Sequence, residues 1–162
     1  MTHLTPALLL GQAQAIMGVV AQAIEMVAPG EGGVGGGQGG SPDSSSSSSS
    51  AARTHALLAS VRASALRALL TLLQHTPATV APHILALAPH LARLAQFSPS
   101  EGCRPFVRAT AVDCLGALAA RMPHHQLHPI RALVVQGLVP VLDDPNRAVR
   151  RRAGACRNAW LV

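Results

Sequence analysis

Three histidines lie close together in the second half of the chain, at a spacing that could serve metal chemistry. His124, His125 and His128 follow directly after Pro123. Neutral imidazoles are common zinc ligands, and a turn that leads into a helix can bring three of them together. No cysteine or carboxylate stands at ligand spacing beside them, so the alternative is a solvated polar turn. We favour the polar turn and expect no metal and no other cofactor.

The three cysteines do not form a recognisable site. Cys103, Cys114 and Cys156 are too few and too widely spaced for a disulfide framework or a CxxC metal site. Cys114 and Cys156 fall in apolar stripes, which predicts small buried residues rather than iron–sulfur ligands. The sequence also has no Ser-His-Asp spacing and no paired carboxylates that would suggest hydrolysis. We therefore expect a protein that is not an enzyme, in a reducing, intracellular compartment.

The end of the sequence contains the second candidate, a docking surface on one helix. Apolar residues recur at steps of four, three and four from Val149 to Trp160, which predicts the buried side of a helix. Four arginines fall on the opposite side, and an acidic turn precedes them. The predicted protein-binding residues are Asp143, Asp144, Arg147, Arg150, Arg151, Arg157 and Trp160. For Trp160 we favour a place in the core, with an exposed binding anchor as the alternative.

Three interpretations of these arginines stay open: an ordinary solvated helix side, a docking surface for an acidic protein, or a nucleic-acid interface. From residue 51 onward, thirteen arginines and four acidic residues give a net charge of +9. All the basic residues are arginine, which drift in genome composition would also produce. With two phenylalanines, one tryptophan and no tyrosine, the chain lacks an aromatic platform for single-stranded bases.

The composition predicts helices packed on helices. Hydrophobic residues make up 49% of the chain but aromatic residues only 2%, so leucine, alanine and valine must form the core, which disfavours a β-sandwich. Residues 1–29 are predicted to form a first helix, with too many polar interruptions for a membrane span and no basic start typical of a signal peptide. Residues 30–50, rich in glycine and serine, are predicted to be a disordered linker.

Residues 51–162 are predicted to form helical repeats. The expected helices are 51–75, 83–97, 105–122, 129–142 and 145–160. Pro89 predicts a kink or break in the second of these, and Pro129 is expected to open the fourth. In the last helix, Asp144 is predicted to be the N-cap and Pro145 the first helical residue.

A Val-Arg pair recurs in this region and indicates an internal repeat. Val61-Arg62, Val107-Arg108 and Val149-Arg150 are 46 and 42 residues apart, within the period of HEAT-type helix pairs. A second marker agrees, because Pro82 and Pro129 follow the first two pairs by 21 and 22 residues. We predict three stacked hairpins in an all-α solenoid. Each valine is expected in the seam, with the adjacent arginine within reach of an acidic turn in the next repeat.

These residues resemble the C-terminal end of the MMS-nineteen (methyl-methanesulphonate-sensitivity) family of HEAT-repeat proteins. The resemblance rests on the runs that begin at Val107, Pro129 and Leu142 and on the late Trp160. It is closest over residues 107–160, weaker over 61–97 and weakest before 51. Pro145-Asn146 replaces a basic pair of the family pattern.

The resemblance implies a non-catalytic scaffold of the cytoplasm and nucleus that takes part in cytosolic iron–sulfur protein assembly. Its implied partners are a WD-repeat propeller with its small partner protein, and client helicases and polymerases of DNA replication and repair. Neither a membrane nor direct nucleic-acid binding is expected. Two alternatives stay open: a basic helical module that binds nucleic acid, and a HEAT scaffold of transport or phosphatase-regulatory type.

Overall fold

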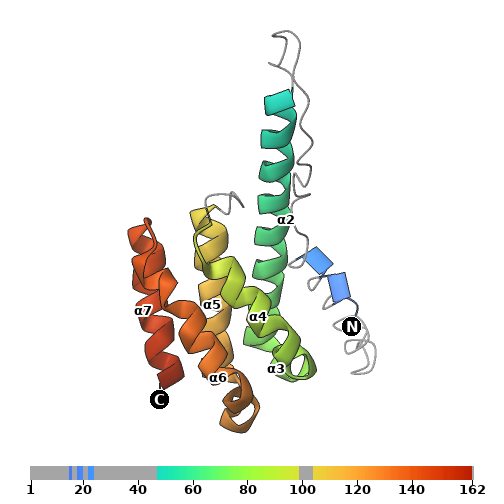
Figure 1. Cartoon of the computed structure of the whole chain (residues 1–162). Coiled ribbons are helices and arrows are strands. Elements are labelled where there is room, and N and C mark those ends of the chain that lie inside the picture. Colours follow the sequence, from blue (N-terminus) through green and yellow to red (C-terminus); the bar gives the residue numbers. More distant parts are fainter. Residues whose placement is uncertain (1–14, 16–17, 20–21, 24–46, 99–103, 162) are drawn as a thin grey trace, which may run out of the picture.

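The computed structural model describes residues 15, 18, 19, 22, 23, 47–98 and 104–161 (Figure 1). Every element over these residues is a helix and none is a strand, which confirms the all-α prediction. The five described residues before 47 are helical, but most of the predicted first helix and linker lies outside the described residues. The linker boundary at residue 50 is wrong, because the next helix begins at Ser47. Serine tolerates a helix once the following residues have nucleated it.

Eight helical segments are described from residue 47 onward. Their bounds are α2 (Ser47–His75), α3 (Pro77–Val80), the 3-10 helix η1 (Ala81–His83), α4 (Ile84–Ala95), α5 (Pro105–Arg121), α6 (His124–Leu138), the 3-10 helix η2 (Pro140–Asp143) and α7 (Arg147–Leu161).

The long helices are arranged in two layers (Figure 1). One layer contains α2, α5 and α7, with α5 packed between the other two. The second layer contains α4 beside α6, and each of these also packs on the helix that follows it. Gly137 on α6 allows the close approach of α4, because a Cβ atom there would lie 2.9 Å from the Cβ of Ala92. Among consecutive long helices, α4 packs on α5 and α6 packs on α7.

Two of the three repeated valines are in the core. Val107 and Val149 are fully buried, as predicted, but Val61 is 46% exposed. The prediction for Val61 is wrong because this residue lies on the side of α2 that carries an open groove, together with Ala15, Val19 and Ala23. Burial of a repeat position depends on a neighbouring hairpin as well as on the residue itself.

Two prolines do not mark the helix boundaries that the sequence predicts for them, whereas Pro105 opens α5 as expected. Helix α6 begins at His124, with Pro123 as its N-cap and Pro129 inside it, so Pro129 does not open the helix. Helix α4 likewise continues through Pro89 without a break. An internal proline removes one backbone hydrogen bond. Both helices bury leucines on each side of the proline, and this packing outweighs the loss.

One stretch of α2 satisfies a simple test for a membrane span. Residues Arg53–His75 are long and apolar enough, with a mean hydropathy of 1.6. The core helix of a soluble protein passes the same test. In this helix Leu66, Leu69 and Leu73 are completely buried in the core, whereas Leu57 and Val61 are 67% and 46% exposed.

Candidate protein-docking sites

A buried ion pair joins α5 to the turn before α7. Arg108 donates hydrogen bonds from Nε to Oδ2 of Asp144 at 2.6 Å and from Nη2 to Oδ1 at 3.0 Å. Arg108 is 2% exposed and Asp144 1%. The ring of Phe97 lies 5.0 Å from the guanidinium carbon, close enough for a cation–π contact. Such a bidentate pair fixes orientation as well as charge, so it sets the position of α7 against α5.

Asp144 is ionised and fully used inside the fold. It also accepts a hydrogen bond from the backbone amide of Asn146 at 2.7 Å. Burial acts to raise the pKa of Asp144, but the hydrogen bonds from Arg108 and Asn146 and the nearby arginine charges outweigh it and hold this pKa below its usual value. The expected reach of Arg108 to an acidic turn is confirmed. Asp144 itself has no exposed carboxylate for a partner, which corrects its place among the predicted contact residues.

The N-cap of α7 is Asn146 rather than Asp144. Oδ1 of Asn146 accepts hydrogen bonds from the amides of Ala148 at 2.9 Å and Val149 at 3.4 Å. The helix begins at Arg147, so Pro145 lies outside it. The carboxylate of Asp144 is directed to Arg108, and the next polar side chain along the chain therefore caps the helix.

The predicted arginine surface divides into two kinds of residue. Arg147 and Arg151 are exposed, and so is Asp143 in the preceding turn. Arg150 is only partly exposed, because its Nη1 donates to the carbonyls of Asp144 at 2.6 Å and Pro145 at 3.1 Å. Arg157 is also partly buried. Arg147 and Arg151 are therefore the two arginines of this surface that a partner can reach most freely.

Trp160 lies in the core, which confirms the favoured interpretation. It is 4% exposed, and its indole Nε1 donates to the carbonyl of Leu115 on α5 at 3.0 Å. An indole held in this way stabilises the packing of α7 on α5. The alternative, an exposed binding anchor, is wrong for this residue.

The two described cysteines are buried, as the apolar stripes predict. Sγ of Cys114 donates to the carbonyl of Leu66 at 3.3 Å. Burial, helped by the charge of Asp113, raises the pKa of Cys156 to about 12 and raises that of Cys114 further. Both thiols therefore stay protonated at neutral pH, and a protonated thiol is a poor nucleophile. Cys103 lies outside the described residues.

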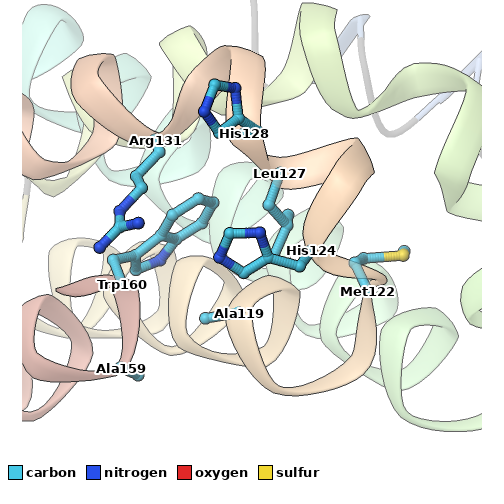
Figure 2. Close-up of a pocket in the computed structure, with 8 residues that line it drawn as sticks. All are labelled: Ala119, Met122, His124, Leu127, His128, Arg131, Ala159 and Trp160. Carbon is cyan, nitrogen blue, oxygen red and sulfur yellow. The ribbon is translucent and has the colours of Figure 1, made fainter. Parts of the chain in front are cut away.

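A small pocket opens between α6 and the end of α7 (Figure 2). Its volume is about 240 Å³, and it is lined by Ala119, Met122, His124, Leu127, His128, Arg131, Ala159 and Trp160. His125 is not among these residues, so the predicted histidine trio is divided. In the described part of the chain, no three His, Cys, Asp or Glu side chains are grouped closely enough to hold a metal ion. The three histidines lie in the first turns of α6, and the predicted polar turn is therefore helical.

The sequence is similar to known proteins over part of its length, although no protein-family model matches it. It is 31% identical over 99 residues to the MMS19 nucleotide excision repair protein homolog of Dictyostelium discoideum, a match to 61% of this chain and 8% of the relative. It is 37% identical over 102 residues to the homolog of Xenopus tropicalis, covering 63% of this chain and 9% of the relative. The DNA repair/transcription protein mms19 of Schizosaccharomyces pombe is 33% identical over 104 residues, 64% of this chain and 10% of that protein.

Over about three fifths of its length, the chain is similar to a segment of MMS19 proteins. It spans about a tenth or less of the length of these MMS19 relatives. The sequence-based site prediction does not include one feature of the structure, the pocket beside Trp160. His124, His128 and Arg131 follow at steps of four and three, which places all three on one side of a helix. The spacing can be read from the sequence, but a helix start at Pro129 places His124 and His128 outside the helix that contains Arg131.

Proposed function

We propose that the chain is a docking section of a non-catalytic scaffold, built as an α-solenoid of HEAT-type hairpins. The ion pair between Arg108 and Asp144 carries this proposal, because it ties one helical hairpin to the turn of the next. The two layers formed by α2, α5 and α7 and by α4 and α6 support it as well. In arrays of this kind each hairpin contacts its neighbours, and the outer surfaces stay free for partners.

The proposed role is that of an adaptor in cytosolic iron–sulfur protein assembly, active in cytoplasm and nucleus. The relatives carry names that refer to nucleotide excision repair and to DNA repair and transcription. An adaptor that helps deliver clusters to repair helicases and polymerases would serve those processes indirectly. We propose a WD-repeat propeller and its small partner protein as the direct partners, with contact through the exposed arginines of α7.

The test is a binding measurement with the purified propeller and its small partner. Arg147→Glu with Arg151→Glu reverses the charge at two exposed positions of α7. We expect binding to weaken at least tenfold, because charge pairs that complement an acidic patch become repulsive. Arg53→Glu with Arg67→Glu makes the same charge change at exposed positions of α2 and should leave binding within about twofold.

Equal binding by both double variants and the unchanged chain would refute docking through α7. The nucleic-acid alternative predicts a different pattern. In that case the chain would retain duplex DNA of any sequence, and affinity would fall steeply between 50 and 200 mM salt (roughly a thousandfold for six contacts).

A further inference from the structure

We propose that the pocket beside Trp160 binds a carboxylate side chain, together with a neighbouring bulky apolar side chain, from a protein segment. This inference rests on the proposed function only in that the ligand is protein. The site differs from the arginine surface of α7, because its cation is Arg131 on α6. None of the predicted contact residues except Trp160 lines it.

The inner wall of the pocket is apolar. Leu127, Met122 and Trp160 are 7%, 8% and 4% exposed, respectively, so their side chains present only a small surface inside the cavity. The indole N–H of Trp160 is already donated to Leu115, which leaves the carbon surface of the ring toward the pocket. An apolar side chain that enters here removes apolar surface from water without leaving a polar group unpaired.

The outer rim consists of nitrogen donors. His124 and His128 are exposed at the mouth, and Arg131 lies one turn further along α6 (Figure 2). Each imidazole can donate a hydrogen bond even when neutral, and the guanidinium has five N–H donors. None of the lining residues is acidic. This combination is complementary to a carboxylate, which accepts several hydrogen bonds and carries the opposite charge to Arg131.

Arg131 also argues against a metal ion. Two histidines four residues apart on a helix could otherwise bind zinc. A permanent positive charge in the same pocket repels a cation, and no acidic ligand is present in the lining to offset it.

The rim is partly organised before a ligand arrives. Nη2 of Arg131 donates to the carbonyl of Leu161 at the end of α7, at 2.7 Å. This bond uses one of the five donors and limits the side-chain rotamers, so less entropy is lost when the guanidinium meets a carboxylate.

The size of the pocket selects the kind of ligand. Sites for small molecules usually enclose about 300–1,000 Å³. The volume of about 240 Å³ is below that range and is suited to one or two side chains of a docked peptide.

The test uses the fluorescence of Trp160, the only tryptophan in the sequence. The probe is a capped hexapeptide of alternating leucine and glutamate, titrated into the full chain. We expect a saturable change in emission and a matching heat signal by calorimetry. A leucine–glutamine peptide of the same length, which lacks the carboxylates, should bind at least tenfold more weakly. Inorganic phosphate at the same concentration should not displace the acidic peptide, because it lacks the apolar part.

Two variants separate the pocket from general charge. Arg131→Gln should lower the affinity for the acidic peptide at least fivefold. Arg67→Gln on α2 removes the same charge at a distant exposed position and should leave this affinity unchanged. Ala119→Leu should also weaken binding because it fills the pocket. Circular dichroism confirms that each variant is folded.

Three outcomes would overturn the proposal: equal binding of the neutral peptide, full competition by phosphate, or unchanged affinity in both pocket variants. None of these depends on the propeller and its small partner. Loss of peptide binding with intact propeller docking would therefore reject the pocket alone. Loss of propeller docking with intact peptide binding would reject the proposed function of the arginine surface alone.

Discussion

The same Val-Arg pair has different surroundings on α5 and on α2. On α5, Val107 is completely buried and Arg108 is paired with Asp144. On α2, Arg62 is 4% exposed but Val61 is 46% exposed. Helix α5 has a packed neighbour on both sides, α2 and α7. The comparison shows that the repeated pair supplies a valine that can pack between helices. Whether this valine is buried depends on an adjoining helix that covers it.

The open side of α2 is an apolar helix surface that no further helix covers in the described part of the chain. A groove of about 430 Å³ is lined by Ala15, Val19, Ala23, Val61, Ser64, Ala65 and Ala68. All but one of these side chains are apolar, and Val19 is 67% exposed. On α5, by contrast, Val107, Val112 and Leu115 are no more than 1% exposed. The following predictions use this contrast.

The largest effect is expected from Asp144→Ala. Removing one partner of a buried ion pair leaves the other charge buried without compensation, which costs about 3–5 kcal/mol of unfolding free energy. Urea denaturation followed by circular dichroism measures this cost. Asp143→Ala changes the adjacent, exposed carboxylate and should alter the free energy by no more than about 0.5 kcal/mol. A similar, small effect of both substitutions would show that the pair does not hold α7 in place.

A smaller difference is expected between the two valines. Val107→Ala removes two buried methyl groups and leaves a cavity, which should cost about 2 kcal/mol. Val61→Ala removes the same atoms from a half-exposed site and gains helix propensity, so we expect a change within about 0.5 kcal/mol. The same denaturation experiment compares them. Equal costs would mean that α2 is covered as fully as α5.

Stability should also depend on pH through Asp144. Its pKa in the folded chain is held below the ordinary value of 3.8, so the unfolded state binds the proton more readily. The contribution of Asp144 to the free energy of unfolding is complete above its pKa in the unfolded chain. It is lost as the pH falls through its pKa in the folded chain. We expect the denaturation midpoint to decrease below about pH 4. In Asp144→Asn this decrease should be smaller, since the group that titrates is absent.

The pKa of Asp113 is shifted in the opposite direction to that of Asp144, so Asp113 serves as a control. Burial raises its pKa in the folded chain even though Arg152 acts to lower it. Its contribution is present below the unfolded pKa and is lost as pH rises through the folded value. Asp113→Asn should therefore not reduce the acid sensitivity. If it did so as strongly as Asp144→Asn, the acid response would not belong to the buried pair.

Local patterns predicted the features that depend on a few neighbouring residues. The helical class, the buried stripe from Val149 to Trp160 and the two buried cysteines follow from spacing alone. The contact between Arg108 and an acidic turn could be predicted because the repeat period places α5 one hairpin before that turn. These features need only the helix period and the order of the hairpins.

Features decided by distant residues could not be predicted in this way. Asp144 has two uses available, as a helix cap or as an ion-pair partner, and Arg108, 36 residues away, determines which one it takes. Pro129 is an ordinary first helical residue by propensity, but the packing of Leu127 and Ile130 extends α6 on its N-terminal side. The exposure of Val61 depends on what covers α2. In each case tertiary contacts override a sound local preference.

The smallest effect is expected at the exposed ion pair between α5 and α7. Nη1 of Arg152 lies 2.5 Å from Oδ2 of Asp113, and the two side chains are 48% and 36% exposed. Water screens such a pair, and both long side chains lose entropy when they are held together, so exposed pairs contribute about 0–1 kcal/mol. A double-mutant cycle with Asp113→Asn and Arg152→Gln measures the coupling directly. The buried pair of Arg108 and Asp144 joins the same helix, α5, to the turn directly before α7. The two ion pairs therefore connect neighbouring parts of the fold and differ mainly in burial. A coupling as large as that of the buried pair would show that position between α5 and α7, and not exclusion of water, determines the strength of these contacts.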